Sequence, residues 1–128
     1  MVVITPSTMN ESRAWLIRAS DAPVLPMPPA YATMAATARR MLRGCLDAFL
    51  ARDADAARAV AAQDDELDIL YKASFQEMLR VMANNPAAVK SATYMLLSGY
   101  SLERIGDRIT NITERIVFIS TGDVKELN

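Results

Sequence analysis

Two pairs of carboxylates at helical spacing are the residues of this chain best placed to do chemistry. Glu103 and Asp107 are four positions apart, and Asp64 and Asp68 repeat that interval upstream. Residues four apart share one face of an α-helix, where like charges destabilise the helix by roughly 0.2–0.5 kcal/mol per pair. We therefore expect something cationic to offset the repulsion, and a metal ion is the simplest candidate.

The expected ligands are all oxygen atoms, which suits a hard cation. Such a site favours magnesium, manganese, calcium or iron, and zinc is less favoured where no Cys or His contributes. Asn111 and Glu114 extend the polar stripe and could add a ligand or hydrogen bonds to the ligands. The competing interpretation is a solvated acidic face whose members pair with basic residues of the same helix, Arg104, Arg108 and Arg115.

The composition favours one all-α domain and excludes several kinds of function. The 128 residues are 52% hydrophobic but only 6% aromatic, with four glycines, which is typical of helix-forming sequences. A net charge of −1 provides no field for nucleic-acid binding. The chain has no histidine, so Ser-His-Asp and Cys-His catalysis within it are excluded.

The sequence also predicts a cytoplasmic protein. Cys45 is the single cysteine, which excludes an internal disulfide and fits a reducing compartment. No segment approaches the roughly 20 apolar residues that cross a bilayer, so we expect no membrane insertion. The first nine residues lack the basic start and apolar stretch of a signal peptide.

Apolar periodicity predicts the first two helices of a bundle. One helix runs from Ala30 to Arg52. Asp53 caps a second helix, which continues to Ala83. Asp64 falls on or beside the buried seam of this second helix. The first helix buries a stripe at three-four spacing, made of Met34, Ala38, Met41, Cys45 and Ala48, which is widened by Leu42, Leu46 and Phe49.

A third, longer helix is predicted from Pro86 to Thr121. Asn85 is its expected cap and Gly122 its expected C-terminal glycine. Its expected apolar seam is Leu102, Ile105, Ile109, Ile112, Ile116 and Ile119. Short connections make neighbouring helices antiparallel, so the predicted fold is an all-α, antiparallel three-helix bundle in which the two acid pairs meet across a groove.

The chain is expected to have four parts. Residues 1–21 hold a short extra N-terminal helix, which begins at a capping box in Thr8–Glu11. Residues 22–29 form a proline-rich linker, residues 30–122 the three-helix bundle, and residues 123–128 a C-terminal tail.

The third predicted helix resembles the signature of PhoU-type regulators of phosphate uptake. That signature is Leu-Glu-Arg-Ile-x-Asp-x-x-x-Asn-Ile-x-Glu, followed by an apolar run and Thr-Gly. The chain matches it with Leu102-Glu103-Arg104-Ile105-Gly106-Asp107, Asn111-Ile112, Glu114, the run Ile116-Val117-Phe118-Ile119 and Thr121-Gly122. Asp64 and Asp68 resemble the family's acid-x-x-x-Asp motif on the preceding helix, and the resemblance covers about Met34 to Leu127.

The resemblance implies a function. It implies a PhoU repeat that binds a divalent or trivalent metal ion (iron, zinc, manganese or magnesium) through Asp64, Asp68, Glu103 and Asp107. It further implies a regulatory adaptor in phosphate uptake and phosphate-starvation signalling, without enzymatic activity. The implied partners are a phosphate ABC transporter and a membrane sensor histidine kinase.

The chain has room for one PhoU repeat, whereas the family usually carries two. Residues 10–17 resemble the end of a repeat, so the leading segment is interpreted as a possible remnant of a preceding one. Trp15, Leu16 and Ile17 then need a surface to cover, and we expect a homodimer to supply it.

Two other functions are compatible with the residues alone. Some all-α nucleotide pyrophosphohydrolases hold magnesium with carboxylates on adjacent helices, but they favour Glu-x-x-Glu spacing. A structural oligomerisation bundle with incidental acids predicts no metal binding at all. A ferritin-like di-iron site is excluded because it requires histidine.

Overall fold

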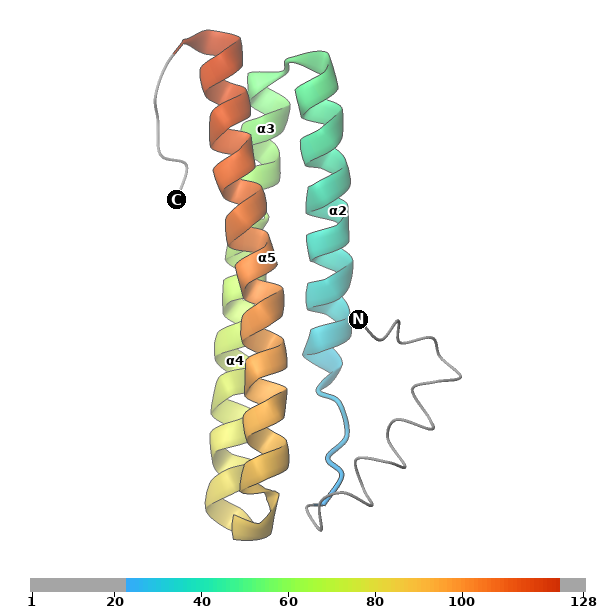
Figure 1. Cartoon of the computed structure of the whole chain (residues 1–128), viewed down its shortest axis with the longest axis vertical. Coiled ribbons are helices and arrows are strands. Elements are labelled where there is room, and N and C mark those ends of the chain that lie inside the picture. Colours follow the sequence, from blue (N-terminus) through green and yellow to red (C-terminus); the bar gives the residue numbers. More distant parts are fainter. Residues whose placement is uncertain (1–22, 123–128) are drawn as a thin grey trace.

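The computed structural model describes residues 23–122, and every regular element among them is helical. Three long helical rods pack against one another, and the second rod along the chain is made of two helices in succession (Figure 1). The elements are α2 (Pro29–Ala51), α3 (Ala54–Ala61), α4 (Asp64–Asn84), the 3-10 turn η1 (Pro86–Ala88) and α5 (Val89–Thr121). The predicted antiparallel three-helix bundle is confirmed.

The core-facing stripe predicted for α2 is confirmed, but its predicted extension is wrong. All five residues of the stripe, from Met34 to Ala48, are buried. The residues expected to widen it are exposed instead: Leu42 by 44%, Leu46 by 55% and Phe49 by 53%. A helix in a three-helix bundle has only two neighbours, so a stripe much wider than the contact remains in solvent.

The second predicted helix is divided into α3 and α4. Asp53 caps α3 as expected, because its Oδ1 accepts hydrogen bonds from the backbone N–H groups of Asp55 and Ala56 at 2.9 Å. Ala62 and Gln63 keep right-handed helical angles between the two helices, so the rod continues in one direction and α4 begins at Asp64. The break places three acids in the first turn of α4, where the helix dipole favours negative charge.

The core face of α5 differs from the predicted isoleucine seam. Ile109 and Ile116 are buried, but Ile105, Ile112 and Ile119 are 42%, 47% and 57% exposed. A row of small residues at seven-residue spacing points into the bundle instead: Ala92, Gly99, Gly106 and Thr113. Their small size lets α5 approach the other helices closely, and a Cβ on Gly99 would lie 2.7 Å from the Tyr31 hydroxyl oxygen of α2.

The ends of the third rod agree partly with the prediction. Gly122 adopts the left-handed conformation (φ 79°) and its N–H donates to the Phe118 carbonyl at 2.8 Å, so it is the expected C-cap. Pro86 begins a 3-10 turn before α5, and the Asn85 side chain forms no capping hydrogen bond. The predicted N-terminal helix in residues 1–21 and the tail 123–128 lie outside the described residues.

Candidate functional site

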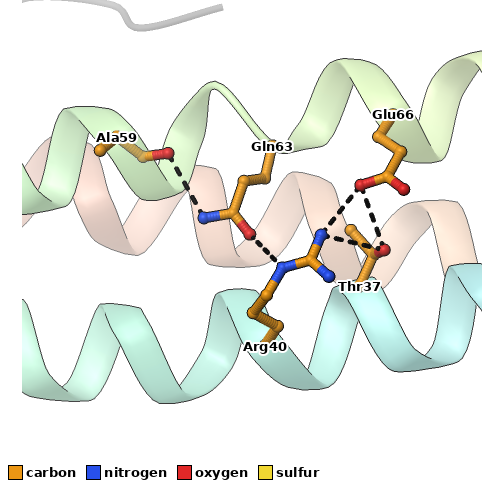
Figure 2. A network of polar contacts seen from close by, with 5 residues as sticks. All are labelled: Thr37, Arg40, Ala59, Gln63 and Glu66. Carbon is orange, nitrogen blue, oxygen red and sulfur yellow. Dashed lines mark hydrogen bonds and ion pairs between the residues drawn. The ribbon is translucent and has the colours of Figure 1, made fainter.

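A polar network fixes the start of α4 against α2 and so positions the first acid pair (Figure 2). The Arg40 guanidinium of α2 donates to the Gln63 side-chain oxygen at 2.8 Å and to the Glu66 carboxylate at 2.9 Å. The buried Thr37 hydroxyl donates to the same carboxylate at 3.3 Å. One arginine of α2 therefore binds both the break between the two helices, at Gln63, and the first turn of α4, at Glu66.

Asp64 lies at the contact between α4 and α5. It is buried, with 4% of its surface exposed, as expected from its place on the seam. Directly opposite is Gly106 of α5, where an added Cβ would collide with the Asp64 carboxylate and with a methyl group of the fully buried Leu67. Gly106 thus admits a carboxylate close to the α5 backbone, in a position that no larger residue would allow.

Glu103 is half-buried beside Asp64, and one of its carboxylate oxygens, Oε2, has no hydrogen-bond partner in the described structure. Burial is the largest influence that raises the pKa of Glu103 above its ordinary value. Asp107, Asp68 and Asp64 raise the pKa further and Arg104 lowers it, so α4 and α5 bring the other three predicted carboxylates within electrostatic reach of Glu103.

Two of the four carboxylates pair with cations of their own helices. Arg104 lies 2.6 Å from Asp107 on α5, and Lys72 lies 3.7 Å from Asp68 on α4. Both pairs are at least partly solvent-exposed, where an ion pair contributes only about 0–1 kcal/mol. The Arg104 pair agrees with the alternative of a locally neutralised acidic face.

Asn111 and Glu114 lie further along α5. The Asn111 side-chain amide donates to the Asp107 carbonyl at 2.9 Å, and Asn111 is exposed. Glu114 is half-buried and follows Asp107 by seven residues, which is about 10 Å along the helix. Neither residue is among the groups that act on the pKa of Glu103.

Two aromatic residues lie near the acids, Tyr71 on α4 and Tyr100 on α5, and the sequence alone assigns them no role in the site. The rings of Tyr71 on α4 and Tyr100 on α5 are 6.3 Å apart, and Glu103 contributes to a raised pKa of Tyr71, after burial. Tyr71 follows Asp68 by three residues, and this helical spacing is the signal that could have identified it. A shallow hollow beside it is lined by Tyr71, Lys72, Phe75 and Gln76.

The donor chemistry of the site fits a hard cation, but the side chains are not gathered around one point. In residues 23–122, no three acidic or cysteine side chains converge closely enough to hold a metal ion as they stand. The buried Glu103 oxygen, which has no hydrogen-bond partner among the described residues, favours a cation there. Coordination by Asp107 would require it to exchange Arg104 for the metal.

Comparison with known proteins identifies the family. Residues 31–116 match the model of the PhoU domain, which is most of the helical bundle. The chain belongs to the PhoU family. The PhoU assignment suggested by the signature on α5 is therefore confirmed.

Similar curated proteins are PhoU homologues. The chain is 39% identical over 90 residues to the phosphate-specific transport system accessory protein PhoU homolog of Clostridium acetobutylicum, covering 70% of this chain and 41% of that protein. It is 34% identical over 111 residues to the homolog of Caulobacter vibrioides, covering 87% of this chain and 48% of that protein. The chain thus spans less than half the length of these relatives, and no solved structure matches it.

None of the helices in residues 23–122 combines the length and apolar composition of a membrane span.

Proposed function

We propose that this protein is a regulatory adaptor in phosphate uptake and phosphate-starvation signalling, and that it does not act as an enzyme. Membership of the PhoU family supports the proposal most strongly, together with relatives whose names describe accessory proteins of the phosphate-specific transport system. A cytoplasmic location fits this role, since the implied partners are a phosphate ABC transporter and the cytoplasmic part of a sensor histidine kinase.

The proposed regulatory element is a metal ion bound between α4 and α5. Asp64 and Asp68 would hold it from α4, and Glu103 and Asp107 from α5. A hard cation would supply positive charge where burial and three neighbouring acids now disfavour the ionised form of Glu103. Because the two helices would share the ion, its binding would stabilise one relative position of α4 and α5 and could be sensed by a partner.

The homodimer stays a prediction. The residues from which it was predicted, Trp15, Leu16 and Ile17, lie outside the described part of the chain. Sedimentation velocity of the full chain at several concentrations tests it directly. A single species with a mass near 14.1 kDa at all concentrations would contradict the prediction.

The first experiment is to measure the metal content of the purified full chain by inductively coupled plasma mass spectrometry. Wild type is compared with the double variant Glu103→Ala/Asp107→Ala. A matched control, Asp47→Ala/Glu77→Ala, removes the same charge at two exposed positions on α2 and α4. We expect stoichiometric iron, manganese, zinc or magnesium in wild type and control, and its loss in the Glu103/Asp107 variant.

Two outcomes would contradict the metal proposal. A wild-type protein that is empty and refuses each of the four added ions has no such site, and its acids are then a locally neutralised surface. Metal retained in the Glu103/Asp107 variant places the site elsewhere. The adaptor role is tested separately by expressing the chain in a bacterium that lacks its own PhoU protein. Failure to restrain a phosphate-starvation reporter at high phosphate would contradict that role.

A further inference from the structure

The isoleucines and leucines that were expected in the core form two exposed apolar stripes. On α2 the stripe is Leu42, Leu46 and Phe49, each 44–55% exposed. On α5 it is Ile105, Ile112 and Ile119, each 42–57% exposed and spaced seven residues apart. Apolar residues scattered singly over a surface are ordinary, whereas apolar residues gathered on one face mark an interaction site.

The α2 stripe lies on the flank of α2 that faces away from α3 and α4. The opposite flank is fixed by contacts, because Arg40 bonds Gln63 and Glu66 and a Cβ on Gly44 would lie 2.8 Å from Val60 of α3. Leu42 and Phe49 are two and nine residues beyond Arg40, which corresponds to about half a turn around the helix. Their flank of α2 is therefore the one opposite α3 and α4, which is the flank next to α5.

The α5 stripe similarly lies on the flank away from α4. Glu103 and Gly106 face α4, as shown by their relation to Asp64 and Asp68. Ile105 and Ile112 are two and nine residues beyond Glu103 and so stand about half a turn away from it. Since α2 packs along α5, both stripes border the groove between these two helices.

The surroundings of the two stripes are basic. Residues three or four positions apart lie beside each other on a helix surface. Four arginines of α2 and α5 stand at this spacing from a stripe residue, and all four are exposed: Arg39, Arg43, Arg108 and Arg115. None of these four forms an ion pair within residues 23–122. No acidic residue of α2 or α5 stands at the same spacing from a stripe residue.

We propose that the groove between α2 and α5 is a docking surface for an acidic amphipathic α-helix of a partner protein. Three isoleucines at heptad spacing cover about 21 Å along α5, which is the contact length of a helix of some 15 residues. Helices bind such grooves through apolar anchors at helical spacing, and acidic residues beside the anchors would pair with the four arginines.

The charge around the groove is what selects this occupant. A second copy of the chain placed on the same face would bring arginines against arginines. An anionic membrane would satisfy the charge, but two apolar stripes at helical spacing along adjacent helices match a helix better than a flat surface. The proposal deepens the proposed adaptor role by naming the surface through which a partner is held.

The experiment uses two synthetic 18-residue peptides as probes. Both carry leucine at two positions per heptad, and their remaining positions alternate alanine with glutamate in one peptide and with lysine in the other. Binding to the full chain is followed by fluorescence anisotropy in the presence of a chelator. We expect the glutamate peptide to bind at least tenfold more tightly than the lysine peptide, and its affinity to fall with added salt.

Variants show whether the groove is the site. Ile112→Glu should weaken binding of the glutamate peptide at least tenfold, because it removes an anchor and introduces a like charge. The matched control, Ile69→Glu, changes an isoleucine that is 67% exposed on α4, and it should leave the affinity unchanged. Arg115→Glu should also weaken binding and reduce its dependence on salt, which a purely apolar contact would not do. Circular dichroism checks that each variant is folded.

Three results would overturn the proposal. Equal binding of the two peptides would show that the arginines do not select the occupant. If neither peptide binds, but the chain binds vesicles of anionic phospholipid and Ile112→Glu abolishes that binding, the groove is a membrane-binding surface. If the chain forms a dimer and Ile112→Glu dissociates it, the groove is a contact between two copies of the chain. Because the chelator removes metal, failure here is distinguishable from failure of the metal site.

Discussion

Glu103 combines burial with three acidic neighbours, and this makes it the residue whose charge state matters most in the site. Its pKa is raised above the ordinary value of 4.5, so folding favours the protonated form. The stabilising contribution of this group is therefore fully present below the ordinary pKa and is lost as pH rises through the raised pKa of the folded state. At neutral pH, and without a cation, the ionised carboxylate opposes folding.

The first prediction follows from the destabilising effect of the ionised Glu103 carboxylate at neutral pH. In the presence of a chelator, Glu103→Gln should unfold at higher urea concentration than wild type at pH 7.5, and the difference should shrink as pH falls toward 4.5. Urea titrations across this pH range measure the effect, with the exposed Glu77→Gln as the control. A variant less stable than wild type at pH 7.5 would contradict the electrostatic account of the site.

Gly106 provides a second prediction at the residue scale. Ala is the better helix former by about 1 kcal/mol, yet its Cβ would meet the Asp64 carboxylate and Leu67, both of which are buried. Overpacking of this kind costs about 1–3 kcal/mol and outweighs that gain, so Gly106→Ala should lower the free energy of unfolding by up to about 2 kcal/mol. Ser101→Ala, at an exposed position of the same helix, should change it by no more than about 0.5 kcal/mol. Stabilisation of the Gly106 variant would show that α4 and α5 are further apart than described.

At the scale of elements, the short helix α3 depends on its cap. It has only eight residues, and Asp53 satisfies two of its otherwise unbonded N–H groups. Asp53→Ala should therefore cost about 1 kcal/mol of unfolding free energy, while Asp53→Asn should retain most of the stability. Thermal unfolding followed by circular dichroism compares the two variants, and equal losses would mean that the charge and not the cap is important.

The helix α5 has a different surface on each side. One flank carries Glu103 and Asp107 toward α4, and the other carries the exposed isoleucines and arginines toward α2. A single rigid helix therefore connects the proposed metal site with the proposed docking groove.

At the scale of the molecule, a single core joins the three rods. Leu67 is fully buried at the contact of α4 with α5 and belongs to the same cluster as Met34 and Met41 of α2. Leu67→Ala should lower the free energy of unfolding by roughly 3 kcal/mol, with one cooperative transition retained. Leu97→Ala, at a position 56% exposed, should lower it by less than about 0.5 kcal/mol, as measured by urea denaturation. Two separate transitions would indicate that a rod unfolds independently.

The sequence by itself determined the all-helical class, the order of the three rods and several of their ends, but not the division of the second rod into α3 and α4. Apolar periodicity located the α2 stripe and placed Asp64 on a buried seam, and the capping preferences of Asp53 and Gly122 were sufficient because caps depend on local chain geometry. The same local spacing put Glu103 and Asp107 on one helix face. The family signature on α5 then identified the PhoU family, which the match over residues 31–116 shows.

Only the tertiary structure decided which side of α5 faces the core and which acids come near one another. Hydrophobicity alone favoured the isoleucine seam, but close packing favours the row of Gly99, Gly106 and Thr113, because helices can approach there without steric overlap. That choice exposes Ile105 and Ile112 and brings Asp64 within electrostatic reach of Glu103. It depends on how side chains of different helices fit together, which the spacing along one helix does not specify.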